Sequence, residues 1–260
     1  MNIYLTDENY FSPEANAVYM SVSQFKAFRK CELFGLRESL GLYQRPATVS
    51  LMVGSYCDAH FEAKLDIFKA QHPEIMKRDG TLKAEYKQAD EIIQRIERDP
   101  LFMKYMSGAK QVIMTGEIDG IPVKIKIDSL LPDKIVDLKI MRDFQRVYVP
   151  EEGKLNFIEA WGYHFQGAVY QEIVRQNTGK VLPFYIAAAT KETVPDIGIF
   201  EVPQSVLEPA LNIFRQDAPK FQAIKQGFLE PEPCGHCEVC KESKEIKRPT
   251  TWEELNETWL

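Results

Sequence analysis

A tight turn between two strongly patterned segments constrains the fold of this chain more than any other feature. Asp119-Gly120 separates residues 111–118 from residues 123–128, and Asp-Gly in this setting is a strong signal for a β-hairpin. In residues 123–128 apolar side chains alternate with two lysines and an aspartate, which is the period of two typical of a strand. Another apolar segment, residues 135–140, follows closely. The sequence therefore predicts three successive strands, of which the first two are antiparallel neighbours.

Helical spacing of apolar residues dominates the chain on both sides of these strands. Helices are predicted over residues 21–31, 50–70, 83–98, 157–177 and 205–226. Two more strands are predicted over residues 182–189 and 197–202. An Asn-Thr-Gly sequence should end the fourth helix, because glycine is favoured just past a helix C-terminus. The pattern predicts an α/β (α+β) fold with a mixed central sheet flanked by helices.

Length and composition fit one large domain, because 260 residues with 45% hydrophobic content can bury a substantial core. We expect a single domain over residues 1–260, with a helical N-terminal part over about residues 1–108 and a cysteine cluster at residues 234–240. No run approaches the roughly 20 apolar residues of a membrane span, and the first residues do not resemble a signal peptide. We therefore expect a cytoplasmic protein that does not contact membranes. The net charge of -6 argues against coating of nucleic acid through overall charge, but it is compatible with a local basic channel.

Two aspartates and a lysine are predicted to meet near the ends of the strands. Asp128 ends the second strand, whereas Asp137 and Lys139 lie two positions apart on the third and share one face. If the third strand is hydrogen-bonded to the second, all three side chains converge. Carboxylates of this kind bind Mg²⁺, and a lysine can position an attacking water and offset negative charge. A surface salt bridge is the simpler alternative, but Asp137 is flanked by apolar residues, where an unpaired charge is costly.

This arrangement resembles the core of the PD-(D/E)xK nucleases, and within them the RecE/RecB-like exonucleases of phage and prophage recombination systems. In those proteins a strand ending in Asp-x-Lys is followed by a helix with Gln-x-x-x-Tyr, and here that helix reads Gln166-Gly-Ala-Val-Tyr170. The resemblance implies a restriction-endonuclease-like core. It also implies that Lys139 acts in catalysis and that Gln166 and Tyr170 line the cleft and steer the DNA strand.

The resemblance further implies the ligands of a Mg²⁺ or Mn²⁺ ion. The implied ligands are Asp58, Asp128, Asp137 and the main-chain carbonyl of Leu138. The family carries a helical Gly-x-x-x-His, where this chain has Gly54-Ser-Tyr-Cys-Asp58. His60 follows two residues later, about 200° around a helix. We expect Asp58 to face the cleft, with His60 as the alternative and as an ordinary, partly buried histidine otherwise.

Other charged residues near these strands have two interpretations. Glu117 is either an additional acid of the cleft or a partner for Lys124 or Lys126. Both lysines are candidates for contacts with DNA phosphates. For Lys124, a solvated strand face is the simpler interpretation. Ile140 stands where the family often has threonine, which removes a phosphate contact but leaves the metal site intact.

Four cysteines suggest a second metal centre. Cys234-x-x-Cys237-x-x-Cys240 supplies three thiolates at close spacing, and Cys31 is the candidate for the fourth. The order of one early and three late cysteines resembles the iron–sulfur nucleases related to AddB and the CRISPR-associated adaptation enzymes, which implies a [4Fe–4S] cluster. Zinc is the alternative, with His236 as a further ligand, and reduced, empty thiols are another. Cys57 has no partner in the sequence and is expected to be a small buried hydrophobe.

Taken together, the resemblance implies a Mg²⁺-dependent exonuclease that degrades one strand of linear double-stranded DNA. The expected partners are DNA ends, a single-strand annealing protein and further copies of the chain in a ring. Two alternatives remain open. One is a DNA-binding protein that keeps the fold without the chemistry, and the other is a zinc- or iron–sulfur-dependent regulator.

Overall fold

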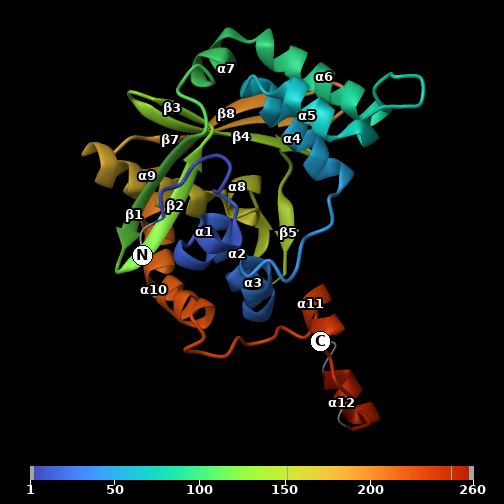
Figure 1. Ribbon diagram of the computed structural model, residues 1–260, viewed down its shortest axis with the longest axis vertical. Helices are drawn as coiled ribbons and strands as arrows, with labels where there is room; N and C mark the ends of the chain where they lie inside the picture. Colours follow the sequence, from blue (N-terminus) through green and yellow to red (C-terminus); the bar gives the residue numbers. More distant parts are fainter. Residues whose placement is uncertain (1–2, 151, 247, 258–260) are drawn as a thin grey trace.

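The predicted hairpin is formed by the green strands β1 and β2 at the left of Figure 1. In the computed structural model, which describes residues 3–150, 152–246 and 248–257, β1 (Val112–Ile118) pairs antiparallel with β2 (Ile121–Ile127). Asp119 and Gly120 connect them with φ angles of 48° and 80°, and two consecutive positive values are typical of a type I′ hairpin turn. The prediction of antiparallel neighbours is therefore confirmed.

A separate four-stranded sheet follows, in the order β3-β4-β7-β8. Its strands are β3 (Ser129–Leu131), β4 (Lys134–Met141), β7 (Phe184–Thr190) and β8 (Ile197–Val202). β4 and β7 are parallel, while the other two pairs are antiparallel, so the predicted mixed sheet is confirmed. The direct pairing of the Asp128 strand with the Asp137 strand, the condition under which these side chains were predicted to converge, is not found among the described strands. β2 pairs with β1, and the chain continues past Asp128 into β3, which pairs with β4 through Ser129 and Val136.

Helices cover both faces of the four-stranded sheet (Figure 1). α9 (Tyr163–Thr178) and α10 (Gln204–Lys225) share one apolar core with Ile135 of β4. α4 (Val49–Phe61) and α6 (Ala84–Glu97) share a second core with Val136 and Leu138. Successive residues of β4 thus point to opposite faces, as a pleated strand requires. Asp137 and Lys139 consequently lie on the face that carries α9.

The remaining elements are short. They are α1 (Pro13–Val18), α2 (Val22–Lys30), α3 (Glu32–Ser39), α5 (Leu65–Gln71), η1 (Pro73–Ile75), α7 (Pro100–Tyr105), β5 (Val147–Val149), β6 (Gly153–Leu155), α8 (Phe157–Ala160), α11 (Glu238–Glu242) and α12 (Trp252–Glu257). Before β1, the named elements among the described residues are helices, and isolated β-bridges occur at Met20 and between Met76 and Leu82. Each helix in the described ranges is too short or too polar to cross a membrane.

Two predicted helices are each divided into two. The predicted helix over residues 50–70 ends at Phe61, because Ala63 adopts a φ of 58° and reverses the chain before α5. The amide of Lys64 donates to the carbonyl of Ala59 at 2.7 Å, which is the long hydrogen bond of a Schellman motif. The predicted helix over residues 157–177 is interrupted at Gly162, with a φ of 64°. Its predicted end is confirmed.

The N-terminal segment, residues 3–20, packs against β2 through a bridge between Met20 and Val123. Beneath it, the Lys124 ammonium donates to the carbonyl of Tyr10 and, at 2.7 Å, to the side chain of Asn16. Lys124 is only 1% exposed. The solvated-face interpretation of this residue is therefore wrong, because the segment covers the face of β2 that the alternation pattern assigns to solvent.

Candidate active site and cysteine centre

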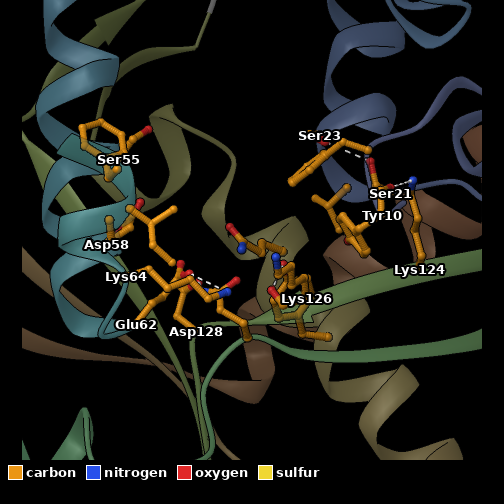
Figure 2. A pocket seen from close by; sticks show the side chains of 18 of the residues that line it. Tyr10, Ser21, Ser23, Ser55, Asp58, Glu62, Lys64, Lys124, Lys126 and Asp128 are labelled. Carbon is orange, nitrogen blue, oxygen red and sulfur yellow. Dashed lines mark hydrogen bonds and ion pairs between the residues drawn. The ribbon is translucent and has the colours of Figure 1, made fainter. Parts of the chain in front are cut away.

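A cavity of about 470 Å³ opens between α4, β2, α9 and the N-terminal segment. Figure 2 shows Asp58, Glu62 and Lys64 on one side of it and Tyr10 and Lys124 on the other. Four of the predicted site residues line this cavity: Asp58, Asp128, Gln166 and Tyr170. Leu138 lines a small adjoining cavity together with Asp58 and Asp128. The fold thus gathers residues that are far apart in the sequence around one space.

Asp128 lies between the end of β2 and the start of β3, and two hydrogen bonds hold its carboxylate in place. Its Oδ2 accepts a hydrogen bond from the Leu138 amide at 2.8 Å, and its Oδ1 accepts one from Gln111 Nε2 at 3.1 Å. The first bond ties the end of the hairpin directly to β4. Asp128 and the Asp137 strand therefore meet as expected, although β2 and β4 are not paired strands.

Asp137 and Lys139 form a buried ion pair behind the cavity. Lys139 Nζ contacts Asp137 Oδ2, and Asp137 is 1% exposed. Burial raises the pKa of the Asp137 carboxyl group, whereas the Lys139 ammonium lowers it and the Asp128 charge raises it again. Burial lowers the pKa of Lys139, but the Asp137 and Asp128 carboxylates outweigh this effect and hold that pKa above its ordinary value. Lys139 is therefore an ammonium group at neutral pH.

Asp58, rather than His60, faces the cavity. Burial and then the negative charge of Asp128 raise the pKa of Asp58 well above its ordinary value. His60 lies on another side of α4, where Nε2 is 2.7 Å from Glu97 Oε1. The helical spacing that favours Asp58 as the cleft residue is thus consistent with the observed positions.

Gln166 and Tyr170 both have protein partners. Gln166 Nε2 donates to Asp137 Oδ1 at 2.6 Å, and the Tyr170 hydroxyl donates to the Lys126 carbonyl at 2.8 Å. Gln166 thus orients one carboxylate while Lys139 pairs with the other oxygen of the same group. Tyr170 supports β2 from the α9 side. Both contacts are of the kind that holds the side chains and main chain of a site in position.

The two remaining charged candidates, Lys126 and Glu117, differ in their position relative to the cavity. Lys126 lines the cavity, but Glu117 does not, and the main chain of Glu117 bonds instead to the Gln176 side chain. The Leu138 carbonyl accepts a hydrogen bond from Lys139 Nζ at 3.2 Å.

Lys26 and Tyr163 lie near the ion pair but were not predicted as site residues from the sequence. Lys26 of α2 lines the cavity and donates to the Trp161 carbonyl at 3.0 Å. Burial lowers the pKa of Lys26 to about 8, and the charge of Lys139 contributes. The Tyr163 ring lies 5.2 Å from Lys139 Nζ and 5.3 Å from Lys26 Nζ. In the sequence both residues look like ordinary positions of amphipathic helices.

The four predicted cysteine ligands come together. The sulfurs of Cys31, Cys234, Cys237 and Cys240 lie within 4.8 Å of one another, and no other group of three or more such ligands in the described part of the chain is gathered closely enough to share a metal ion. The amides of Cys234 and Cys237 point at neighbouring sulfurs, at 3.4 Å and 3.3 Å. His236 is exposed and outside the group, and Cys57 is buried elsewhere, in the α4 and α6 core. Four sulfurs with amide hydrogen bonds form a donor set suited to a soft metal centre.

The distances between these sulfurs help to distinguish a single zinc ion from an iron–sulfur cluster. Four thiolates at about 2.3 Å from one tetrahedral Zn²⁺ lie roughly 3.8 Å apart. The Cys31–Cys240 and Cys234–Cys240 sulfur distances, 3.5 Å and 3.9 Å, are close to this value. A four-iron cluster is larger than a single ion and needs its ligand sulfurs further apart. All four sulfurs lie within 4.8 Å of one another, so the present spacing is closer to that of a single zinc ion than to that of a four-iron cluster.

The mixed sheet, the paired aspartates and the lysine between them define a PD-(D/E)xK-type domain. The sequence profile described as a PDDEXK-like domain of unknown function (DUF3799) matches residues 21–243, and the chain belongs to this family. The crystal structure of a candidate exonuclease from Eubacterium rectale is similar, with a TM-score of 0.94 and 48% sequence identity. The match covers 98% of this chain and 98% of that one. No curated protein matches the chain.

Proposed function

We propose that this protein is a metal-dependent deoxyribonuclease that acts as an exonuclease on linear duplex DNA. The observation that carries the proposal is the convergence of Asp128, Asp137 and Lys139 beside one cavity, with Gln166 bonded to the same carboxylate as the lysine. The description of the E. rectale relative as a candidate exonuclease supports the choice of reaction.

The donor set at this site suits a hard divalent cation such as Mg²⁺ or Mn²⁺. Asp58, Asp128 and Asp137 interact electrostatically with Lys139 and with one another, although their oxygens are not gathered as closely as the four cysteine sulfurs. Asp137 Oδ2 makes no hydrogen bond among the described residues beyond its ion pair. These aspartates and the Leu138 carbonyl would hold the ion. When bound, it would supply Lewis-acid stabilisation of the phosphoryl group and lower the pKa of a coordinated water.

The chain's own residues then have separate tasks. Lys139 keeps its proton, so it donates hydrogen bonds to the attacking oxygen or the phosphoryl group and offsets their negative charge. Gln166 holds Asp137 in one orientation, and Tyr170 holds the main chain of β2. A site positioned in this way needs little reorganisation during the reaction.

The proposed physiological context comes from the resemblance to RecE/RecB-like enzymes. Degradation of one strand from a duplex end leaves a single-stranded tail, which a single-strand annealing protein would bind in phage-type recombination. A ring of several copies around the duplex would keep the enzyme on its substrate.

The test is digestion of an end-labelled linear duplex, with Mg²⁺ or Mn²⁺, by wild type, Asp137→Ala and the control Asp133→Ala. Asp133 is an exposed acid that pairs with its neighbour Lys134, away from the cavity. We expect nucleotide release by wild type and Asp133→Ala, and none with EDTA or Asp137→Ala. A circular duplex should remain intact. Binding without any hydrolysis would instead support the silent DNA-binding alternative.

We also propose that the four-cysteine group holds a metal centre that fastens the C-terminal segment to α2 and α3. The resemblance favours [4Fe–4S], whereas the sulfur spacing favours a single zinc ion. Iron and sulfide analysis with a visible absorption spectrum of anaerobically purified protein distinguishes the two. A regulator that depends on this centre would lose activity with Cys234→Ser but keep it with Asp137→Ala.

The position of Asp58 leads to a paired prediction. Asp58→Asn is expected to reduce hydrolysis by about 10²-fold, because a carboxylate oxygen beside Asp128 is lost from the proposed ion site. His60→Gln should change the rate less than about twofold, since His60 contacts Glu97 outside the cavity. Rates at several Mg²⁺ concentrations measure both effects. A larger loss with His60→Gln than with Asp58→Asn would reverse the assignment.

A further inference from the structure

Asp7 connects two lysines that line the cavity. Its Oδ2 lies 2.9 Å from Lys64 Nζ, and its Oδ1 lies 3.0 Å from Lys126 Nζ. Lys64 follows α4, and Lys126 belongs to β2, so the two ammonium groups come from different walls (Figure 2). One carboxylate from the N-terminal segment thus satisfies a pair of cations at the mouth of the candidate active site.

The pairing has the pattern of a phosphodiester contact. Each carboxylate oxygen takes one ammonium group, and the two non-bridging oxygens of a DNA phosphate present the same pair of acceptors. The Phe11 ring lies 5.8 Å from Lys126 Nζ, is 71% exposed and also lines the cavity. An exposed aromatic ring beside lysines is the combination that binds unpaired bases and backbone together.

Asp7 is not needed to hold the N-terminal segment in place. Leu5, Tyr10, Ala15 and Tyr19 form a buried apolar cluster of their own, and Lys124 bonds to the segment separately. The Asp7 side chain is 42% exposed, so it can turn to solvent without unpacking its neighbours. An ion pair of this exposure contributes little to folding, which leaves the two lysines available to a stronger anion.

The charged groups of the cavity lining fall into two sets. Glu62 Oε2 lies 3.5 Å from Lys64 Nζ, so one carboxylate stays beside Lys64 when Asp7 turns away, whereas Lys126 pairs with Asp7. Asp58 and Asp128 line the same cavity and interact with each other, and this acidic part suits a cation. The other part carries the lysines, which suit the backbone of a strand whose scissile phosphate reaches the acidic part.

We propose that Lys64 and Lys126 form a phosphate-binding subsite for the DNA backbone, and that Asp7 occupies this subsite until a substrate phosphate displaces it. This inference rests on the proposed function, because it assumes that DNA enters this cavity. Asp7 then acts as a built-in competitor that weakens binding of DNA and discriminates against weakly charged ligands.

The test is binding of a short fluorescein-labelled duplex in EDTA, followed by anisotropy at several salt concentrations. Asp7→Asn is expected to tighten binding by about 3–10-fold, because two ion pairs no longer compete with the phosphate. Lys64→Gln and Lys126→Gln should each weaken binding and reduce the slope of log K against log salt by about 0.9. In the background of both lysine substitutions, Asp7→Asn should give no gain.

Asp217→Asn is the matched control. It removes the same charge, and Asp217 is 37% exposed and pairs with Arg29 at 3.4 Å, outside the cavity lining. Unchanged or weaker binding by Asp7→Asn overturns the inference, and so does a gain that persists without the two lysines or that Asp217→Asn reproduces. If these results accompany normal Mg²⁺-dependent hydrolysis by wild type, only this inference fails. If wild type neither binds nor hydrolyses DNA, the proposed function fails with it.

Discussion

Replacement of Lys139 by methionine is expected to lower the rate of DNA hydrolysis by about 10²–10⁴-fold while DNA binding in EDTA is retained. The ammonium group is the cation in direct contact with Asp137, and its raised pKa keeps it charged throughout the neutral range. Methionine preserves the length and apolar stem of the side chain but supplies no proton and no charge. Single-turnover rates at saturating Mg²⁺ measure the loss in the chemical step.

The same substitution should destabilise the fold, since Asp137 is buried and would lose its partner. Removing one member of a buried ion pair costs about 3–5 kcal/mol. Urea unfolding in EDTA should show this loss for Lys139→Met, and Asp137→Asn in addition should restore part of it. Lys134→Met is the control on the same strand, because Lys134 pairs with the exposed Asp133 and lies 5.3 Å from the Tyr105 ring, away from Asp137. Undiminished hydrolysis by Lys139→Met would refute the role given to this residue.

Replacement of Cys240 by serine is expected to remove the metal centre and lower the melting temperature by roughly 6–12 °C, equivalent to about 3 kcal/mol for a chain of this size. Cys240 is buried with Cys31, Phe34 and Val239 in a small core that joins α3 to α11. Without a metal, that core has few apolar contacts to hold the C-terminal segment. Metal analysis and calorimetry of the same preparation measure both effects.

Cys57→Ala serves as the matched control for the cysteine experiment. Cys57 is also buried, but it lies in the α4 and α6 core. Its replacement leaves a small cavity that costs about 1 kcal/mol and should leave the metal content unchanged. Full metal occupancy in Cys240→Ser would show that the four sulfurs do not act as one site.

Much of the architecture follows from local patterns. The hairpin around Asp119-Gly120 was predictable because few residue pairs allow two consecutive positive φ angles. The common face of Asp137 and Lys139 was predictable because strand geometry leaves no alternative once the strand is recognised. The Gln166 position was predictable only through resemblance, since nothing in the helix itself distinguishes a glutamine that bonds to Asp137.

The errors have physical causes that a local pattern does not contain. Ala63 carries no helix-ending signal, yet it adopts the left-handed conformation at the end of α4, and Leu65 and Phe68 of α5 pack against the α4 and α6 core. Gly162, by contrast, was a readable signal for the break before α9. Lys124 alternates with apolar residues like any solvated position, but an N-terminal segment distant in sequence covers it. Lys26 and Asp7 were missed for the same reason. Only tertiary structure brings Lys26 to the cavity and Asp7 to two lysines that line it.

A metal bound to the four cysteines would also change the unfolded chain. Cys31 and Cys240 are 209 positions apart, so a metal that joins them closes a loop around nearly all of the nuclease core. A denatured chain that keeps its metal remains a ring with two short tails, and its conformational entropy is lower than that of an open chain. The entropy lost on closing a loop grows only with the logarithm of the loop length. The long loop between Cys31 and Cys240 therefore adds little beyond what a loop of moderate length would give. The larger effect is topological. Proteolytic cleavage within an exposed loop of the core would leave both fragments joined through the metal, so a nicked molecule would separate only when the centre is lost.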